Sequence, residues 1–497
     1  MSIKLSNNRI ETLAKAVRKT GQLLSFYEGV TVDSRKVKPG FIFAAVKGYK
    51  TDGHLYIEKA VESGAALILT ERHPEEIDAG KAAVMQVEDI RATISHLAFA
   101  FEDDPQNGVK IAGITGTNGK TTVSTLVHQV LSTLGIKAGL MGTVGRMIGD
   151  EVVESHLTTG DPEQIASDMA EMRSKGCSHL VMEVSSHALD QKRTEAITFN
   201  VGAFTNLSHD HLDYHGTAEA YRDAKKRLFD QLDENAVAVI NTDEADAAHM
   251  VKDTKAVLWN YGQKDESMRI ISNNADGLVI EIDEVLIESP LCGKFNASNV
   301  AAAYLVCRAL GCSAENTAAA LASAKGAKGR LERVEFEQEN DASNELPAVF
   351  VDYAHTPDAL KNVLETLRNM EPEKELTVVF GCGGDRDKSK RPVMGEIASQ
   401  LADKIMITSD NPRTEDPEAI IKDILKGVKG DAIDSLADRP GAIRAAIHGA
   451  AGNGMVLIAG KGHETYQEVM GKRHHMDDFE LAQAALVARA TQTQGEN

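Results

Sequence analysis

The chain has 497 residues, more than one hydrophobic core usually organises, so we expect several domains and predict three. Its 54 Lys and Arg residues against 74 Asp and Glu residues give a net charge of −20, which argues against a general nucleic-acid or anionic-membrane surface. The five cysteines lack metal-type spacing and lie in apolar stretches, as reduced core thiols do. No stretch reaches the ~18 apolar residues of a membrane span. Residues 1–4 lack the apolar core of a signal peptide, so we expect a soluble cytoplasmic protein.

Residues up to about 100 predict a small α/β domain. Strand-like segments at 40–46 and 65–69 are separated by a helical run at 56–63. The acidic, turn-prone segment 102–108 then resembles a linker. We therefore place a first domain at residues 1–102.

Residues 113–122 contain the most informative motif, Gly-Ile-Thr-Gly-Thr-Asn-Gly-Lys-Thr-Thr, between the β-prone segment 109–112 and an amphipathic helix pattern. Its glycines let backbone N–H groups turn toward phosphate oxygens, Lys120 supplies a cation, and the Thr121 hydroxyl can ligate Mg²⁺. Ile114 stands where the usual spacing has glycine, so this is a variant loop. An ordinary glycine-rich turn is the alternative, but the strand–helix context favours a nucleoside triphosphate site.

Two polar segments follow strand-like runs in the same region. Glu183 comes after the apolar residues 178–181, and a carboxylate at a strand end is a natural Mg²⁺ ligand, although an ordinary surface glutamate is the alternative. Residues 204–216 contain three histidines and two aspartates, which suggests a metal site or an acid–base cluster. Zinc-hydrolase spacings are absent. Spacing alone leaves His211 either a ligand or an ordinary histidine.

Two further segments are ambiguous. Lys225 lies in the helical run 218–232 beside Lys226 and Arg227, which on composition alone indicates a solvated basic patch. The turn at 293–299 enters an Ala-rich helix, and its amides could contact a purine edge or simply cap the helix. We end the central domain at residue 332.

A β–α alternation restarts at residue 347 and predicts a parallel, doubly wound sheet at 333–497. Strands are expected at 348–351, 376–380, 404–407 and 455–459, and helices at 358–369, 393–401 and 417–428. The polar segments 381–387, 409–413 and 460–464 each follow a strand, so they should converge at one edge of the sheet, where ligands bind. Solvated turns are the alternative. We expect the tail at 491–497 to fray.

Together these motifs resemble the ATP-dependent amino-acid ligases of peptidoglycan precursor synthesis, and among them the members that add the third residue. The resemblance spans nearly the whole chain and rests on the segments 31–35, 52–53, 116–122, 158–160, 183–187, 205–216, 329–332, 352–357, 381–392, 410–413 and 460–464. It implies an α/β fold with a small N-terminal uridine-diphosphate domain, a central P-loop ATPase-like domain at 103–332 and a C-terminal Rossmann-like domain that binds the amino acid.

The resemblance also implies ligand sites. The UDP-muramoyl-dipeptide would contact Val32, Ser34, Tyr49, Lys50, Thr51, Thr158, Thr159, Ser185, Gln191 and Arg193. Leu157 departs from the Asn that close relatives often carry. ATP would contact Gly116, Thr117, Asn118, Gly119, Lys120, Thr121, Thr122, Asn296, Arg330 and Asp352. The implied catalytic residues are Lys120, Glu183, His211 and Lys225, and the implied Mg²⁺ ligands are Thr121, Glu183, His211 and an N-carboxylated Lys225.

The implied amino-acid site consists of Arg391, Asp410, Asn411, Pro412, Arg413, Gly460 and Glu464. Lysine-adding relatives generally depart from Asp-Asn-Pro-Arg at its last position. An arginine fork suits the second carboxylate of meso-diaminopimelate, which lysine lacks, so Arg413 predicts diaminopimelate. The expected reaction activates the D-glutamyl γ-carboxylate as an acyl phosphate, which the amine then attacks.

Three alternatives stay open at this stage. A lysine-adding ligase of the same family differs only in the incoming amino acid. Folylpolyglutamate synthetase has a similar phosphate loop but is disfavoured by the segment 33–35. An inactive ATP-binding regulatory protein is disfavoured by the joint presence of Lys120, Glu183, His211 and Lys225. We expect a monomer without nucleic-acid partners or membrane insertion.

Overall fold

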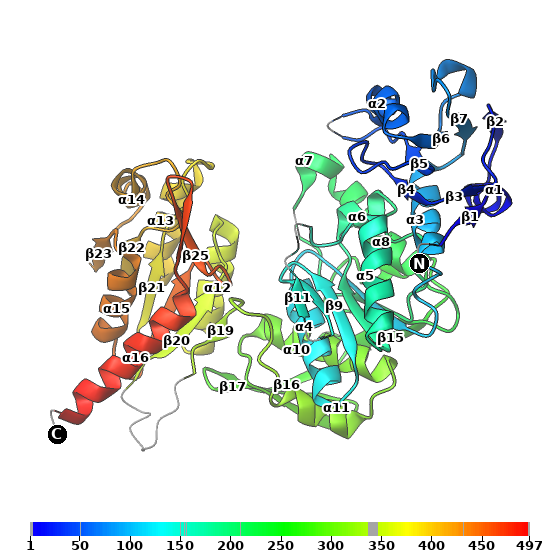
Figure 1. Ribbon diagram of the computed structural model, residues 1–497. Helices are drawn as coiled ribbons and strands as arrows, with labels where there is room; N and C mark the ends of the chain where they lie inside the picture. Colours follow the sequence, from blue (N-terminus) through cyan, green and yellow to red (C-terminus); the bar gives the residue numbers. More distant parts are fainter. Residues whose placement is uncertain are drawn as a thin grey trace. The chain divides into compact units, whose positions relative to one another are not determined.

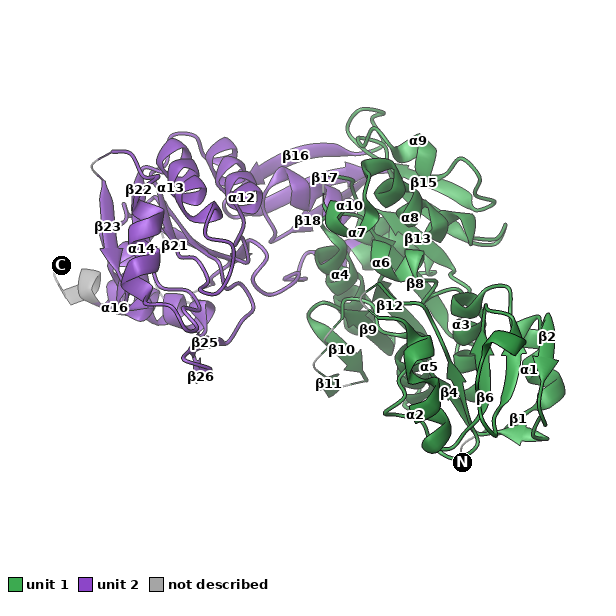
Figure 2. Cartoon of the chain, turned by 90° about the horizontal axis from the view of Figure 1, so that it is seen from above, with its two compact units in different colours: residues 1–267, 302–317 green, residues 268–301, 318–497 purple. Residues whose placement is uncertain are grey.

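A computed structural model describes residues 3–49, 51–149, 151–153, 155, 157–208, 210–335, 346–430 and 432–495. The chain forms two compact units, one of residues 1–267 with 302–317 and one of residues 268–301 with 318–497 (Figure 2). The domain boundaries expected after residues 102 and 332 stay a prediction.

The first unit begins with a five-stranded sheet in the order β2-β7-β6-β5-β4, in which only β2 runs antiparallel (Figure 1). The apolar runs of β5 and β6 are almost wholly buried, as parallel strands covered on both faces are. The expected strands at 40–46 and 65–69 are confirmed as β5 and β6. The elements are β1 Leu5–Ser6, β2 Arg18–Thr20, β3 Phe26–Tyr27, β4 Gly29–Thr31, β5 Phe41–Ala44, β6 Ala65–Thr70, β7 Ala83–Gln86, α1 Asn7–Ala14, α2 Ile57–Glu62, α3 Ile90–Phe101, and the 3-10 helices η1 Gly53–Tyr56 and η2 Pro74–Glu76.

The same unit contains an eight-stranded sheet in the order β11-β10-β9-β12-β8-β13-β14-β15. The strands from β9 to β15 in this order are parallel, and β10 and β11 extend the edge as an antiparallel pair. The strands are β8 Lys110–Thr115, β9 Ala138–Gly142, β10 Gly145–Ile148, β11 Glu151–Val153, β12 His179–Glu183, β13 Val201–Phe204, β14 Val237–Asn241 and β15 Val257–Tyr261. The helices are α4 Lys120–Thr133, α5 Pro162–Ser174, α6 Ser186–Asp190, α7 Leu212–His215, α8 Ala218–Asp230 and α9 Ala247–Met250.

The second unit contains a six-stranded sheet in the order β19-β20-β24-β21-β22-β23, parallel except for β19. Alternate residues of its strands join two separate cores. One core contains α12, α13 and α14, and the other contains α15 and α16, so helices cover both faces. The expected doubly wound sheet is confirmed, although α14 ends at Leu425 and not at residue 428.

The remaining elements of this unit include an antiparallel sheet of β16, β17 and β18 and the hairpin β25–β26, neither of which we predicted. The strands are β16 Arg269–Asn274, β17 Gly277–Ile282, β18 Val285–Ser289, β19 Glu332–Arg333, β20 Ala348–Asp352, β21 Leu376–Phe380, β22 Lys404–Thr408, β23 Ile433–Leu436, β24 Met455–Ala459, β25 Tyr466–Val469 and β26 Lys472–His475. The helices are α12 Pro357–Met370, α13 Lys390–Leu401, α14 Pro417–Leu425, α15 Arg439–Gly449 and α16 Asp478–Gly495, while α10 Lys294–Ala309 and α11 Ala314–Leu321 contribute to both units.

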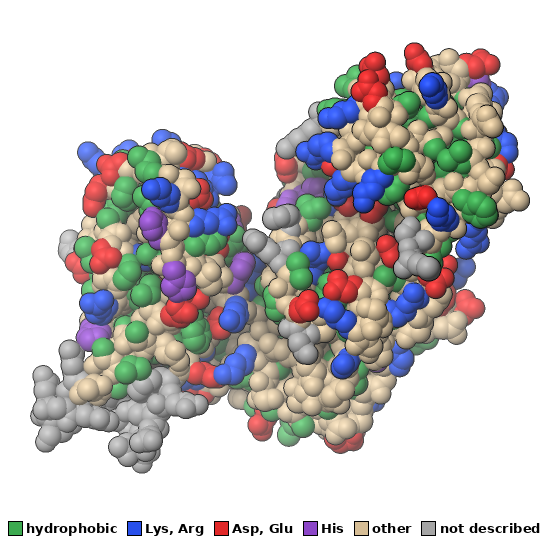
Figure 3. All heavy atoms as spheres, viewed as in Figure 1, with side chains coloured by type: hydrophobic (Ala, Val, Ile, Leu, Met, Phe, Trp, Pro, Cys, Tyr) green, Lys and Arg blue, Asp and Glu red, His purple; other side chains and the backbone are tan. Residues whose placement is uncertain are grey.

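The positions of the cysteines and of the charged side chains agree with what the composition predicts. All five cysteines are buried free thiols, as expected. Figure 3 shows side chains of both charge signs interspersed on the face drawn. Within the described ranges, no helix is long and apolar enough to cross a membrane.

Candidate active site

The predicted phosphate loop connects β8 to the N-terminus of α4. Gly116 has a φ of +151°, and a Cβ there would lie 1.9 Å from Thr205 Oγ1, so no larger residue fits. Gly119 has a φ of +83° and caps α4. The Lys120 ammonium donates to the carbonyls of Gly116 and Thr117 at 2.9 and 2.8 Å. The two glycines therefore allow a loop that brings Lys120 and the N-terminus of α4 together, which is the arrangement of an anion site.

Glu183 is the last residue of β12, which runs parallel to β8 and places Glu183 opposite Ile114. Its side chain is buried. One carboxylate oxygen accepts hydrogen bonds from the hydroxyls of Thr121 and Thr143, at 3.0 and 3.1 Å, and the other accepts the Thr143 N–H at 2.8 Å. The expected strand-end carboxylate therefore contacts the phosphate loop. Sequence reasoning missed Thr143, which gave no motif signal.

Lys225 is buried against the same loop. Only 1% of the residue is exposed, its ammonium donates to the Gly116 carbonyl at 2.9 Å, and it lies 4.2 Å from the centre of the Tyr221 ring. Burial, reinforced by the charge of Lys120, lowers the pKa of Lys225 well below its usual value. The interpretation of this residue as a solvated basic patch is wrong, because α8 turns it inward.

His211 lies apart from the contacts of Glu183. Its side chain is 49% exposed, and its ring packs 4.8 Å from His187 and 6.2 Å from Tyr221. Burial raises the pKa of Tyr221 to about 12, so this phenol stays neutral. Within the described segments no three His, Cys, Asp or Glu residues form a metal-binding group. The structure thus joins Thr121 with Glu183, while Lys225 and His211 both contact the Tyr221 ring.

A pocket of about 280 Å³ in the first unit is lined by residues from helices and from the loops that follow strands. Of the residues expected to bind the UDP-muramoyl-dipeptide, Val32, Tyr49, Thr51, Gln191 and Arg193 line it, together with Val46, Gly48, Gly53, Tyr56, Arg91, Ile94, Asp161, Pro162 and Tyr214. Lys50 lies outside the described residues. Ser34 is buried and does not line the pocket. Arg91 and Tyr214 are pocket residues that sequence reasoning missed.

The other three expected substrate residues form a hydrogen-bonded connection between this pocket and the phosphate loop. The Arg193 guanidinium donates to the Thr159 carbonyl at 2.9 Å. The Thr159 hydroxyl donates to the Glu183 carbonyl at 2.8 Å and accepts the Ser185 N–H at 3.0 Å. The Thr158 hydroxyl lies 3.1 Å from that of Thr143. Thr159 therefore links the pocket residue Arg193 to the backbone of Glu183.

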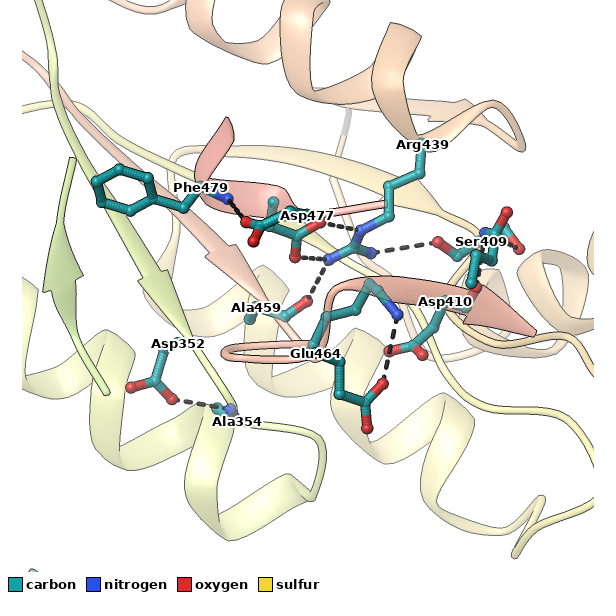
Figure 4. Close-up of polar contacts among 12 residues, drawn as sticks. Asp352, Ala354, Ser409, Asp410, Arg439, Ala459, Glu464, Asp477 and Phe479 are labelled. Atoms are coloured by element: carbon teal, nitrogen blue, oxygen red, sulfur yellow. Dashed lines mark hydrogen bonds and ion pairs between the residues drawn. The ribbon is translucent and has the colours of Figure 1, made fainter. Parts of the chain in front are cut away.

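In the second unit the three polar loops after β21, β22 and β24 converge, as expected from the parallel sheet. Figure 4 shows Ser409 and Asp410 of the loop after β22 near Glu464 of the loop after β24. The Gly384 N–H donates to the Asn411 carbonyl at 2.9 Å, and Arg413 Nη1 donates to the Gly384 carbonyl at 2.8 Å. Gly460 has a φ of +120°, and a Cβ there would lie 2.6 Å from the buried carboxylate of Asp410. A Cβ on Gly384 would lie 2.0 Å from the Pro412 carbonyl.

The two arginines expected to bind diaminopimelate occupy different environments. Arg391 is 1% exposed, and its guanidinium pairs with Glu415 at 2.9 Å and Asp423 at 3.0 Å. Hydrogen bonding to Arg391 lowers the pKa of Glu415 to about 2. Arg413 has a φ of +51° and a partly exposed side chain, with its Nε 3.6 Å from the Glu468 carboxylate. Arg413 is therefore the more accessible of the two to a ligand.

Three residues expected near ATP also lie in the second unit. Asn296 is fully buried, donates to the Cys292 carbonyl at 2.9 Å and accepts from Asn299 at 3.0 Å. Asp352 accepts the N–H groups of Leu331 and Ala354, and burial raises its pKa. The Arg330 guanidinium lies 5.0 Å from the centre of the Tyr353 ring.

A glycine-rich loop that contacts a buried carboxylate and a buried lysine, on a parallel sheet, defines a P-loop-type α/β enzyme. Three family models match successive parts of the chain: "Mur ligase family, catalytic domain" at residues 26–102, "Mur ligase middle domain" at 114–307 and "Mur ligase, glutamate ligase domain" at 329–462. The chain belongs to the Mur ligase family of ATP-dependent ligases, as the sequence resemblance implied.

Relatives match over nearly the full length. The UDP-N-acetylmuramoyl-L-alanyl-D-glutamate–2,6-diaminopimelate ligase of Cytophaga hutchinsonii is 41% identical, over 90% of this chain and 92% of the relative. The enzyme of the same name from Bacillus licheniformis is 40% identical, over 92% of this chain and 94% of the relative. A solved structure of a ligase of that name superposes with a TM-score of 0.73 at 32% identity, covering 99% of this chain and 100% of the other.

Proposed function

We propose that this protein is an ATP-dependent ligase that joins meso-2,6-diaminopimelate to the D-glutamyl γ-carboxylate of UDP-N-acetylmuramoyl-L-alanyl-D-glutamate, in the cytoplasmic synthesis of peptidoglycan precursors. Similarity to ligases named for this reaction, over nine-tenths of the chain, supports it. The observation that carries the chemistry is the contact of Thr121, at the start of α4, with buried Glu183. The active species is proposed to be a monomer.

The reaction needs carboxylate activation, because a carboxylate oxygen is a poor leaving group. The γ-carboxylate attacks the γ-phosphorus of ATP, the bond to the β–γ bridging oxygen breaks, and ADP leaves. The amine then attacks the carbonyl carbon of the acyl phosphate, loses a proton, and inorganic phosphate leaves as the amide forms. Lys120 and the N-terminus of α4 offset the negative charge that gathers on the transferred phosphoryl group.

Magnesium fits the donors beside the loop. The Thr121 hydroxyl and the Glu183 carboxylate are the oxygen ligands that this cation prefers, and both lie at the phosphate loop. N-carboxylation of Lys225 would turn a buried cation into a carboxylate-bearing ligand, and His211 would supply an imidazole. Bound Mg²⁺ would neutralise phosphate charge. In this scheme Lys225 serves as a modified residue and not as a cation.

The loop and helix residues that line the pocket of the first unit are proposed to hold the UDP-muramoyl-dipeptide. Arg193 supplies positive charge there, and Tyr49, which is 74% exposed, offers an aromatic face for stacking on a planar base. The connection from Arg193 through Thr159 to Glu183 fits a substrate whose reacting carboxylate must reach the phosphate loop.

Phosphate release from ATP tests the proposal. Purified protein would receive UDP-muramoyl-L-alanyl-D-glutamate with meso-diaminopimelate, L-lysine or no amino acid. We expect release only with diaminopimelate, because Arg413 can pair with its second carboxylate. Release with L-lysine but not with diaminopimelate would overturn the assignment in favour of the lysine-adding ligase. Release with a folate and glutamate would favour folylpolyglutamate synthetase.

A further inference from the structure

Lys461 is a completely buried lysine in the loop after β24, within the cluster of polar loops in the second unit. Its ammonium lies 3.3 Å from Asn411 Oδ1 and 3.3 Å from Glu464 Oε2, and 5.4 Å from the centre of the Tyr466 ring. Burying a charged group is costly unless partners compensate it. Its partners here are both residues of the proposed amino-acid site.

The loop backbone holds Lys461 in this position. The Glu464 N–H donates to the Lys461 carbonyl at 2.9 Å, which closes a turn between them. Both neighbours of Lys461 must be glycine. Gly460 faces the Asp410 carboxylate, and Gly462 has a φ of +51° with a Cβ position 2.7 Å from Tyr353 Cβ. The turn therefore fixes both the lysine and the carboxylate that it contacts.

The contacts also fix the orientation of the Asn411 amide. Its Oδ1 accepts the Glu468 N–H at 2.9 Å and faces Lys461, while its Nδ2 donates to Glu464 Oε2 at 2.8 Å. Glu464 Oε2 thus receives two protein donors. Its Oε1 has no hydrogen-bond partner among the residues that the structure describes.

We infer that Lys461 is a positioning residue for amino-acid selection: with Asn411 it holds Glu464 Oε2, so that Oε1 faces the ammonium at the non-reacting end of the incoming amino acid. The inference rests on the proposed function and deepens it. At the non-reacting end of the amino acid, the Arg413 guanidinium can pair with the carboxylate and the Glu464 carboxylate can pair with the ammonium. A site with both groups favours an amino acid whose non-reacting end carries an ammonium as well as a carboxylate. It therefore binds diaminopimelate in preference to a dicarboxylate that has only one amine.

The test compares meso-diaminopimelate with 2-aminopimelate, which keeps both carboxylates and one reacting amine but lacks the second ammonium. The wild type should prefer diaminopimelate by about 10- to 100-fold in kcat/KM, the range of one charge-assisted hydrogen bond. Lys461→Met and Lys461→Gln should reduce this preference to about threefold or less, through a higher KM for diaminopimelate. Glu464→Gln should reduce it similarly, and Lys461→Met should add little to that variant.

Lys429→Met is the matched control, because this lysine of the same unit is 76% exposed. The KM values for ATP and for the UDP-muramoyl-dipeptide, with thermal unfolding curves, report general damage, which would slow both amino acids equally. An unchanged preference in both folded Lys461 variants would overturn the inference while leaving the proposed function intact. A wild type that turns over neither amino acid would defeat both. Lys461→Arg keeps the charge and should retain part of the preference.

Discussion

The ammonium of Lys225 donates a hydrogen bond to the carbonyl of Gly116, 2.9 Å away, although 109 positions separate the two residues in sequence. This contact attaches helix α8 to the phosphate loop. It also places Lys225 beside Lys120. The positive charge of Lys120 adds to the effect of burial, and both disfavour the ammonium form of Lys225. A lysine amine reacts with CO₂ only when it is neutral. The environment of Lys225 therefore favours the neutral amine, which is the form from which the carbamate of the proposed metal site would arise.

Replacing Lys225 with Ala should lower kcat by about 100-fold or more, because a charged group next to the transferred phosphoryl group is lost. Added short-chain carboxylic acids should restore part of the activity by entering the vacated space. Lys226→Ala is the control, since this neighbour pairs with Asp230 and Asp253 instead. Full activity of Lys225→Ala without added acid would refute the role.

The unmodified Lys225 should also make stability depend on pH. Its pKa in the folded protein is below the usual 10.5, so the unfolded chain binds more protons between the two values. In CO₂-free buffer, stability relative to the uncharged variant Lys225→Met should therefore rise as the pH increases toward 10.5. Thermal unfolding of both proteins across this range measures the difference. A difference that stays constant with pH would contradict the lowered pKa.

Thr143 orients Glu183 through its hydroxyl and its N–H. Thr143→Val keeps the N–H and the shape but removes the hydroxyl that contacts both Glu183 and the Thr158 hydroxyl. Loss of the hydrogen bond to Glu183, worth about 1 kcal/mol, should lower kcat by about fivefold. Thr133→Val, at the exposed end of α4, is the control. Steady-state kinetics with all three substrates would check this. Equal kcat values for the two variants would show that the Thr143 hydroxyl is dispensable.

Sequence patterns predicted the features that are determined by residues close together in the chain. The phosphate loop was recognisable because Gly116 and Gly119 adopt conformations that favour glycine, and the parallel strands because they are continuous apolar runs. The burial of Lys225 was also predictable, though we missed it. It lies four positions after Tyr221 and four before Phe229, both buried, and so on the apolar face of α8.

Other features depend on partners far along the chain. The buried state of Arg391 results from Glu415 and Asp423, 24 and 32 residues later, which no local pattern relates to it. Whether Arg391 still contributes to the amino-acid site is a prediction that kinetics must decide. Thr143 is another such residue, because its contact with Glu183 arises only when β9 and β12 become neighbours.

Arg413→Ala should raise the KM for diaminopimelate by about 30-fold, equivalent to about 2 kcal/mol for a lost charged hydrogen bond. Arg413→Lys should recover only part of this, because an ammonium lacks the planar fork. Arg444→Ala, an exposed arginine on α15, is the control. Initial rates at varied diaminopimelate would decide, and an unchanged KM in Arg413→Ala would count against the assignment.

Arg439 should be needed for stability more than for chemistry. Its guanidinium and the Asp478 carboxylate are both completely buried, with two hydrogen bonds between them at 2.7 and 2.6 Å, and it also donates to the carbonyls of Ser409 and Ala459. Arg439→Met leaves Asp478 buried without its partner, which should cost about 3–5 kcal/mol of unfolding free energy. The double variant Arg439→Met with Asp478→Leu should recover much of this loss, because no unpaired charge remains. Urea unfolding followed by circular dichroism measures each value, and a loss in Arg439→Met no larger than that in Arg444→Met would show that the buried pair contributes little.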